Sequence, residues 1–145
     1  MSDYKNLVKK TIALLALREH SRYELQQKLL RRGYSLDAIS FVVDDLIFQG
    51  LQSDRRFAES YACSRASRGY GPQRIYLELQ QKGVDDEVIQ AVMEEIGVDW
   101  LALAKKVYDK KFGRVKPSTL QEKLRRQNFI RYRGFSVSKS LVDSF

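Results

Sequence analysis

Three turns of the same composition divide this chain of 145 residues. In each turn a basic residue is followed by glycine and then by an apolar residue: Arg32-Gly33-Tyr34, Lys82-Gly83-Val84 and Arg133-Gly134-Phe135. The three glycines are spaced by 50 and 51 positions, a period typical of repeated helical modules. We therefore predict an all-α chain of three tandem three-helix repeats, similar to helix-turn-helix units, that form an elongated, curved molecule.

Glycine also marks the predicted helix ends, because the residue that follows a helix commonly takes the left-handed conformation. Seven of the eight glycines follow an apolar-periodic segment: Gly33, Gly50, Gly69, Gly83, Gly97, Gly113 and Gly134. Ser21 with Glu24 matches a capping box at a helix start, and Ser118 with Gln121 offers a second one. These signals place the predicted repeats at residues 1–52, 53–98 and 99–145.

Apolar side chains recur at helical spacing and recur again after fifty residues. In the first helix we expect Val8, Ile12 and Leu15 to line the buried face. A shift of fifty positions superimposes apolar residues of the first repeat on those of the second: Leu7 on Phe57, Leu25 on Ile75, Leu29 on Leu79, Ile39 on Ile89, Val42 on Val92 and Leu46 on Ile96. Apolar and polar residues do not alternate with period two over any long stretch of the sequence, so the sequence does not predict strands.

The formal net charge of +8 is unevenly distributed. Residues 1–34 carry a net +5, residues 35–99 a net −6 and residues 100–145 a net +9. This pattern indicates an anionic partner met at separated places, two partner surfaces of opposite sign, or solvated helix faces that favour solubility.

The sequence contains no apolar run of the ~18 residues needed to cross a bilayer, and residues 1–10 lack the apolar stretch of a secretory signal. We expect a cytoplasmic protein without membrane association. The single cysteine, Cys63, agrees with a reducing compartment and is expected to be a small buried side chain.

Residues suited to catalysis or metal binding are sparse. His20 has no second histidine beside it, so we expect it to be structural or exposed. Adjacent carboxylates such as Asp44 and Asp45 point to different sides of a helix, and the sequence has no Walker-type glycine loop. We predict a protein that is not an enzyme and that uses no metal, cofactor or small-molecule substrate.

Basic residues interleaved with aromatic residues are the strongest binding signal. One cluster surrounds Tyr108 and Phe112: Lys105, Lys106, Lys110, Lys111, Arg114 and Lys116. Another surrounds Phe129 and Tyr132: Lys123, Arg125, Arg126, Arg131 and Arg133. We expect Tyr108, Phe112 and Phe129 in the core, whereas this density of cations favours contact with phosphates or an acidic protein face.

A further cluster, in the middle repeat, consists of arginines: Arg55, Arg56, Arg65, Arg68 and Arg74. Arginine forks suit bidentate contacts with carboxylates. Two roles are equally open for them, namely internal pairing with Asp54, Glu59 or Glu78, and binding to a partner.

These arginines carry a family resemblance. The run Asp54-Arg55-Arg56-Phe57-Ala58-Glu59-Ser60-Tyr61, followed by Ser64-Arg65 and by Arg68-Gly69-Tyr70-Gly71-Pro72 with Arg74-Ile75, closely resembles the central signature of the bacterial RecX family. Residues 18–22 with Glu24-Leu25 and Lys28-Leu29 resemble its first-repeat motif, and Tyr132-Arg133-Gly134-Phe135 resembles its last. The resemblance spans nearly the whole chain.

The resemblance implies tandem three-helix repeats that regulate the RecA recombinase. Such a protein is expected to lie in the groove of the RecA filament on single-stranded DNA, to damp filament growth, strand exchange, ATP hydrolysis and repressor cleavage in the SOS response, and to bring no catalytic residue or cofactor. The candidate contacts are Arg55, Arg56, Arg65, Arg68 and Arg74, with Lys105, Lys106, Lys110, Lys111 and Arg114 as a second zone. We expect a monomer with at most weak DNA binding. The alternative is a helix-turn-helix DNA-binding protein.

Overall fold

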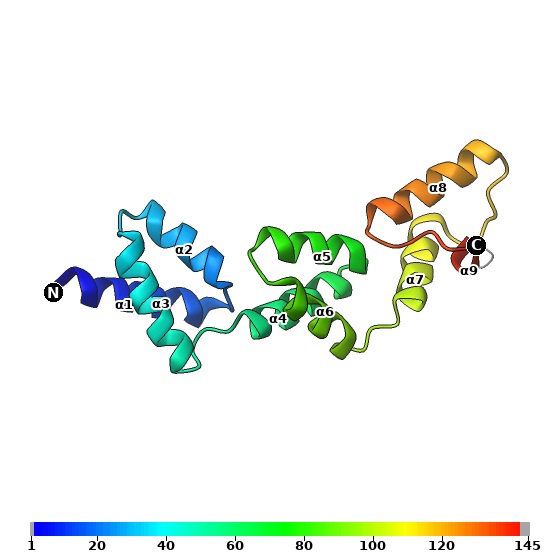
Figure 1. Ribbon diagram of the computed structural model, residues 1–145. Helices are drawn as coiled ribbons and strands as arrows, with labels where there is room; N and C mark the ends of the chain where they lie inside the picture. Colours follow the sequence, from blue (N-terminus) through cyan, green and yellow to red (C-terminus); the bar gives the residue numbers. More distant parts are fainter. Residues whose placement is uncertain (1, 143–145) are drawn as a thin grey trace. The chain divides into compact units, whose positions relative to one another are not determined.

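The computed structural model describes residues 2–142, and this part of the chain is helical without any strand (Figure 1). The helices, in chain order, are α1 (Ser2–Leu17), α2 (Arg22–Arg31), α3 (Leu36–Phe48), α4 (Asp54–Ser67), α5 (Pro72–Gln81), α6 (Asp86–Glu95), α7 (Trp100–Phe112), α8 (Leu120–Tyr132) and α9 (Lys139–Val142). The predicted all-α fold class is confirmed.

The glycines predicted to end helices all have a positive φ, from +64° at Gly97 to +102° at Gly134. The turns after α2, α5 and α8 also share one hydrogen-bond pattern, seen at Gly33, whose amide donates to the Leu30 carbonyl oxygen at 3.0 Å while the Tyr34 amide donates to that of Leu29 at 3.4 Å. This is the Schellman arrangement, which satisfies the last carbonyl groups of a helix. The glycine positions in the sequence therefore predicted the helix ends correctly.

One predicted capping box is confirmed and the other is wrong. Ser21 Oγ accepts from the Glu24 amide at 3.0 Å, and Glu24 Oε1 accepts from the Ser21 amide at 3.2 Å. At the start of α8, however, Thr119 Oγ1 caps the helix by accepting from the Glu122 amide at 3.1 Å, in place of the predicted Ser118 and Gln121. Neighbouring Ser118 and Thr119 both carry a hydroxyl group, so local sequence does not distinguish them.

The described chain divides into two compact units. The first unit contains the residues up to 60 together with residues 79–92, and the second contains residues 61–78 together with the described residues from 93 onward. Segments of the predicted middle repeat, 53–98, occur in both units. The repeat boundaries at 1–52, 53–98 and 99–145 stay predictions.

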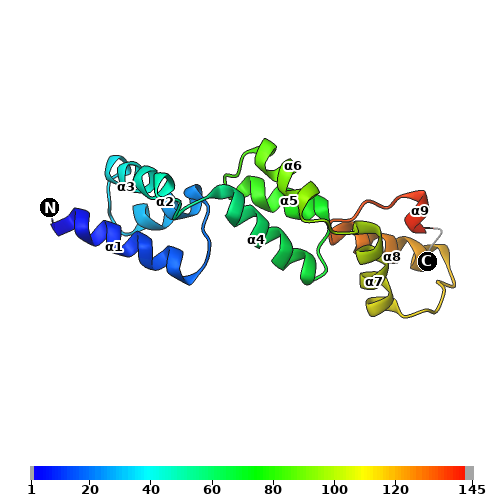
Figure 2. The ribbon, with the colours of Figure 1, turned by 90° about the horizontal axis from the view of Figure 1, so that it is seen from below.

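Helices α1, α2 and α3 enclose one hydrophobic core of the first unit (Figure 2). Its buried side chains come from all three helices: Leu7, Leu25, Leu29, Ile39, Val42, Val43 and Leu46. Of the three residues predicted for the buried face of α1, Val8 and Leu15 pack against this core, whereas Ile12 is exposed and Thr11 is buried beside Leu7. Thr11 tolerates burial because its Oγ1 donates to the Leu7 carbonyl oxygen at 2.7 Å.

The predicted fifty-residue recurrence of buried positions is confirmed for most pairs. Both members are at most 2% exposed in five of them: Leu7 and Phe57, Leu25 and Ile75, Leu29 and Leu79, Ile39 and Ile89, and Val42 and Val92. Leu46 is buried, but its counterpart Ile96 is only half-buried. Helix α6 ends at Glu95, one residue before Ile96. Ile96 therefore lies outside the helix, and the helical repeat no longer directs its side chain to the core.

The second unit has its own core among α7, α8 and α9: Ala104, Val107, Tyr108, Ile130, Phe135 and Leu141. The Tyr108 and Phe112 ring centroids are 5.1 Å apart, and those of Phe112 and Phe129 are 5.4 Å apart. Tilted and edge-to-face contacts of this kind are favourable between aromatic rings. The expectation that these three aromatic residues pack in the core is confirmed.

The single cysteine and the single histidine differ in how exposed their side chains are. Cys63 is exposed on α4, contrary to the predicted burial, because its neighbours Ala62 and Ala66 occupy the buried positions of that helix. His20 is buried, with Nδ1 at 3.0 Å from the Arg18 carbonyl oxygen and Nε2 at 2.8 Å from Lys28 Nζ. A neutral imidazole satisfies both contacts by donating at Nδ1 and accepting at Nε2. The structural role predicted for His20 is therefore confirmed.

In the first unit, the turn at Lys82 and Gly83 docks on the start of α2. Ser21 Oγ donates to the Lys82 carbonyl oxygen at 2.7 Å, and Glu24 Oε2 lies 3.5 Å from Lys82 Nζ. A Cβ on Gly83 would lie 2.5 Å from Tyr23 Cβ, a distance that real side chains do not adopt. The absence of a side chain at position 83 is what allows this approach.

In the second unit, the turn at Arg133 and Gly134 docks on the start of α5 in a similar way. The Gly71 amide donates to the Arg133 carbonyl oxygen at 2.7 Å, and the Gln73 amide donates to the Gly134 carbonyl oxygen at 3.0 Å. A Cβ on Gly71 would lie 2.5 Å from the Gly134 carbonyl carbon. Two of the three basic-glycine-apolar turns are therefore docking elements as well as helix ends, which the spacing alone did not predict.

Candidate functional site

Arg65 on α4 and Glu78 on α5 form a bidentate ion pair in the second unit. Arg65 Nε lies 2.9 Å from Glu78 Oε1, and Nη2 lies 3.0 Å from Oε2. The Tyr61 hydroxyl donates to the same carboxylate at 3.2 Å. Burial is the largest single influence on the pKa of Arg65 and lowers it, but the hydrogen bonds to Glu78 together with the attraction of nearby negative charge outweigh burial and raise the pKa. Of the two roles left open for Arg65, the structure shows internal pairing.

Three guanidinium groups surround the ring of Tyr70. The Cζ atoms of Arg65, Arg74 and Arg133 lie 3.8 Å, 4.7 Å and 4.7 Å from the ring centroid. Arg74 Nε also lies 3.5 Å from Glu78 Oε2, so this carboxylate pairs with two of the three guanidinium groups, those of Arg65 and Arg74. The attraction between cations and the ring face offsets part of their mutual repulsion. We call this group, with Glu78, the Tyr70 cluster, and it carries excess positive charge.

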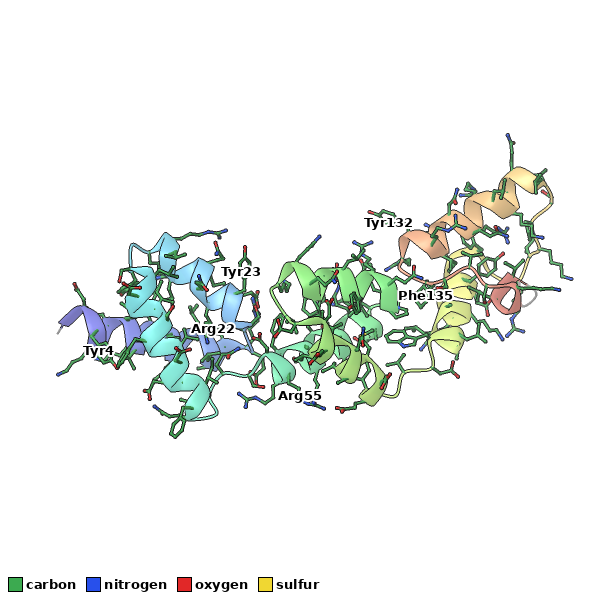
Figure 3. The ribbon with its side chains drawn as sticks, viewed as in Figure 1. Tyr4, Arg22, Tyr23, Arg55, Tyr132 and Phe135 are labelled. Carbon is green, nitrogen blue, oxygen red and sulfur yellow. The ribbon has the colours of Figure 1, made fainter. Side chains whose placement is uncertain are left out.

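Tyr132 stands at the end of α8 and extends away from the helix (Figure 3). Its side chain is 74% exposed, and Arg74 Cζ lies 5.1 Å from its ring centroid. Arg74 Nη1 also donates to the Tyr132 carbonyl oxygen at 3.3 Å. An exposed ring beside a cation offers a surface on which a planar group can stack.

A cavity of about 470 Å³ opens in the second unit. Its cationic lining comes from the end of α4, from α7 and from the turn after α8: Arg68, Lys106, Lys110, Lys111 and Arg133. Its apolar lining includes Leu103, Val107 and Phe129. None of the described residues that line it is an Asp or Glu. We call this cavity the basic pocket.

The arrangement of the pocket follows from helix geometry and from one shared arginine. Lys106 and Lys110 are four positions apart and so lie on the same face of α7. Lys111 Nζ is 5.5 Å from the Phe129 ring centroid, and Arg133 Cζ is 5.6 Å from it. Because Arg133 also contacts Tyr70, it joins the basic pocket to the Tyr70 cluster. Tertiary structure thus brings Arg68, from the arginine cluster of the middle repeat, together with three lysines from the basic cluster around Tyr108 and Phe112.

The other predicted contact residues do not gather at this site. Arg55 pairs with Glu59 at 3.5 Å, and Arg56 pairs with Glu19 at 3.0 Å, both within the first unit. Arg56 Nη1 also donates to the Gly50 carbonyl oxygen at 2.8 Å.

Lys105 and Arg114, from the second predicted zone, are absent from the lining of the basic pocket. Lys105 is half-buried on α7, and Arg114 is exposed in the connection after that helix. The charge pattern of the sequence grouped them with Lys106 and Lys110, but their positions around and beyond the helix separate them from the pocket.

One arginine counted among the basic residues is structural. Arg126 is only 8% exposed and donates to the Tyr108 hydroxyl at 3.0 Å and to the Val115 carbonyl oxygen at 2.7 Å. Its Nε lies 3.0 Å from Glu122 Oε1. The bonds to Tyr108 and Glu122 raise the pKa of Arg126. The four-residue spacing of Glu122 and Arg126 was the available sequence signal for this pairing.

The site consists of cations and aromatic rings. Within residues 2–142, no group of three or more His, Cys, Asp or Glu side chains is placed to hold a metal ion. No helix of the described chain has the length and apolar character needed to span a membrane. Positive charge in a concave, partly apolar setting is suited to binding anions.

Fold and site together define an all-helical repeat protein with a basic, partly apolar pocket. The chain matches the family profiles for "RecX, first three-helix domain" over residues 9–46 and "RecX, second three-helix domain" over residues 53–93. Regulatory protein RecX of Halorhodospira halophila is 45% identical over 128 residues, which cover 88% of this chain and 80% of that protein. Regulatory protein RecX of Pseudomonas fluorescens strain Pf-5 is 40% identical over 124 residues, covering 86% and 80%. The chain belongs to the RecX family, as the arginine signature indicated.

Two solved structures share this fold. A crystal structure of regulatory protein RecX superimposes with a TM-score of 0.82 at 22% identity, covering 97% of this chain and 71% of that one. The crystal structure of RecX from Lactobacillus salivarius gives a TM-score of 0.75 at 23% identity, covering 99% and 94%.

Proposed function

We propose that this chain regulates the RecA recombinase by binding in the groove of the RecA filament on single-stranded DNA. There it limits filament extension, strand exchange, ATP hydrolysis and coprotease activity during recombination and the SOS response. The observation that carries this proposal is membership of a family whose curated relatives are named regulatory protein RecX. We further propose that it acts in the cytoplasm, as a binding protein and not as an enzyme.

The basic pocket is the part of the predicted contact surface that we assign to the filament. Arg68, Lys106, Lys110 and Lys111 are exposed, and within the described chain none of them forms an ion pair. Their charges are therefore available to a partner. Arg65 and Arg74 instead bind Glu78 and hold the Tyr70 cluster in place.

Arg55 and Arg56 supply a secondary contact in this proposal. Their side chains are 49% and 44% exposed, and each takes part in a surface ion pair. Because exposed ion pairs contribute at most ~1 kcal/mol, a partner carboxylate or phosphate can replace the internal one at little cost.

The direct test follows ATP hydrolysis by preformed RecA filaments while substoichiometric amounts of the protein are added. We expect the rate to fall and the filaments, seen by electron microscopy, to shorten. An unchanged rate together with unchanged filament length would rule the proposal out.

A pair of charge-matched variants tests where the filament is bound. The pocket variant carries Lys106→Ala, Lys110→Ala and Lys111→Ala, and the control variant carries Lys5→Ala, Lys9→Ala and Lys139→Ala, which are exposed residues of α1 and α9. Both lose three positive charges, and exposed lysines contribute little to stability, so both should melt like the parent. We expect only the pocket variant to inhibit RecA less. Equal inhibition by the two variants would exclude the pocket from the contact surface.

A further inference from the structure

We propose that the outer face of α3 binds a basic amphipathic helix of a partner protein. We call this surface the α3 face, and it consists of two phenylalanines and three aspartates: Phe41, Phe48, Asp37, Asp44 and Asp45. The inference goes beyond the regulation of RecA, because it concerns a second surface, on the first unit, whose charge is opposite to that of the basic pocket. Its test uses no RecA, so the two proposals can fail separately.

Helix geometry places the five side chains of the α3 face together. The buried residues of α3 lie on one side of the helix and pack in a hydrophobic core of the first unit: Ile39, Val42, Val43 and Leu46. Phe41 and Phe48 are seven positions apart, which corresponds to two helical turns and about 10 Å along the axis. They lie opposite the buried residues with Asp37 between them around the helix, while Asp44 and Asp45 flank this line.

The aromatic rings of the α3 face are open to solvent. Phe48 is 91% exposed, the highest value for a large apolar side chain in the described chain, and Phe41 is 66% exposed. The ring of Tyr4 on α1 is also exposed, and its centroid lies 6.1 Å from that of Phe41. Single exposed apolar residues are common on protein surfaces, but neighbouring exposed aromatic rings are typical of a protein interface.

The charge of the α3 face indicates which partner it fits. Helix α3 contains three aspartates and no Lys or Arg. Asp44 pairs with Arg22, and Asp45 accepts a hydrogen bond from the neutral side chain of Gln49 at 2.8 Å. The carboxylates attract Lys and Arg side chains, and they repel both the phosphates of nucleic acids and anionic lipid surfaces. The face therefore fits a protein segment in which cations lie beside apolar side chains.

A helical partner fits this face better than an extended one. The backbone amides and carbonyls of α3 bond to each other within the helix, so the face offers no backbone partner to an extended chain. A partner helix satisfies its own backbone groups and can present apolar residues at the two-turn spacing of Phe41 and Phe48. Lysines or arginines at the edges of that apolar stripe then meet Asp37 and Asp45.

The test measures, by fluorescence anisotropy, how the full chain binds a labelled amphipathic helix of about 18 leucine and lysine residues. The face variant carries Phe41→Ser and Phe48→Ser, and the surface control carries Leu77→Ser and Leu120→Ser, whose side chains are 59% and 72% exposed. Both variants lose two exposed apolar side chains, so both should melt like the parent. We expect the face variant to bind the peptide at least about tenfold more weakly, and the surface control to bind like the parent. Equal affinities of the two variants would exclude the α3 face.

A single substitution guards against misfolding of the double variant. The Phe48 ring is almost fully exposed, so Phe48→Ser should have the melting curve of the parent. We expect this change to account for most of the loss of affinity, because the most exposed ring has the most apolar surface to bury. If Phe48→Ser binds the peptide as tightly as the parent, the α3 face is not the site.

The aspartates are tested separately, because their contribution depends on salt. Asp37→Asn combined with Asp45→Asn should weaken peptide binding about threefold at roughly 50 mM salt and by less at roughly 200 mM, since salt screens exposed charges. A peptide in which glutamate replaces every lysine should not bind. Equal binding of the two peptides, or unchanged binding by the Asn variant, would contradict a basic partner.

Two other occupants of the α3 face would overturn the proposal. If the parent sediments as a dimer and the face variant as a monomer, a second copy of the chain covers the face. If the parent co-sediments with vesicles of phosphatidylcholine and phosphatidylglycerol and the face variant does not, the face binds a lipid surface.

Discussion

Gly71 and Gly134 lie back to back, with the Gly71 amide donating to the carbonyl oxygen of the adjacent Arg133 at 2.7 Å. Neither glycine has room for a Cβ: one on Gly71 would lie 2.5 Å from the Gly134 carbonyl carbon, and one on Gly134 would lie 2.7 Å from the Arg74 amide nitrogen. Arg74, Arg133 and Tyr132 are all next to this contact. When the turn at Gly134 docks on the start of α5, it therefore also brings these three side chains of the candidate site together.

Gly134→Ala should therefore destabilise the protein strongly. The φ of +102° disfavours any side chain, and the new methyl group would collide with backbone and Cβ atoms of Arg74. We expect a loss of roughly 2–4 kcal/mol in the free energy of unfolding, measured by urea denaturation. Gly33→Ala is the control, since its φ is +90° but nothing lies within 4 Å of the added atom, so it should cost only about 1 kcal/mol. Equal losses would contradict the close contact.

Gly83→Val should disrupt the equivalent contact in the first unit. Its φ is +80°, and the added Cβ would lie 2.5 Å from Tyr23 Cβ. We expect the melting temperature to fall by at least ~4 °C, measured by circular dichroism. Because the clash is with the Tyr23 Cβ, which Ala retains, Tyr23→Gly in the same protein should recover more stability than Tyr23→Ala. A melting temperature equal to that of the parent would show that no such contact exists.

Glu78→Gln should cost more than its exposed counterpart Glu59→Gln. Glu78 accepts a bidentate fork from Arg65 and is 20% exposed, whereas Glu59 pairs with Arg55 and is 44% exposed. We expect losses of about 1–3 kcal/mol for Glu78→Gln and below ~0.5 kcal/mol for Glu59→Gln in urea denaturation. The Glu78→Gln loss should shrink little at high salt, because half-buried pairs are weakly screened. Similar small losses for both would contradict a structural role for the fork.

Glu24 should make the first unit sensitive to acid. Burial raises the pKa of its carboxyl, but hydrogen bonds from Arg18 and from the Ser21 amide, with the nearby charge of Lys82, lower it to about 2 from an ordinary 4.5. The folded state then binds fewer protons than the unfolded state, so stability is present above pH 4.5 and is lost as the pH falls toward 2.

The check compares unfolding free energies of the parent and Glu24→Gln across this range. We expect a difference of about 1–3 kcal/mol at neutral pH that disappears near pH 2. Glu122, whose pKa is also lowered to about 2 by Arg125 and Arg126, titrates in both proteins and cancels from the difference. A difference that does not depend on pH would contradict this role of Glu24.

His20 should add a second pH effect at milder acidity. Burial lowers its pKa below 6.5, and the charges of Arg18 and Lys28 act in the same direction. The folded state therefore binds fewer protons here as well, so stability should be constant above about pH 6.5 and should decrease as the pH falls below it. His20→Gln should abolish this decrease, measured as melting temperature between about pH 7.5 and 5. If the melting temperature of the parent and that of His20→Gln depend on pH in the same way, the prediction is wrong.

The helices, their ends and most buried positions were predictable because they depend on local chemistry. Gly33, Gly83 and Gly134 take a left-handed conformation that other residues adopt at a cost, and Ser21 caps whichever helix follows it. In α1 the burial of Thr11 and the exposure of Ile12 were missed, because Thr11 is polar and is buried only since its own helix satisfies its hydroxyl. The family was also predictable, since the arginine signature is a contiguous pattern.

The helical segments, their glycine ends and the set of available cations could therefore be read from the order of the residues alone. Which of these cations lie close together depends on how the helices pack. Arg68, Lys110 and Arg133 are far apart along the chain and share one pocket because the turn at Gly134 docks on Gly71. Arg65 became a structural residue because Glu78 of another helix reaches it, while nearby Arg68 keeps an exposed charge. Such pairings depend on the distances between helices, and the local conformational preferences of a sequence do not contain those distances.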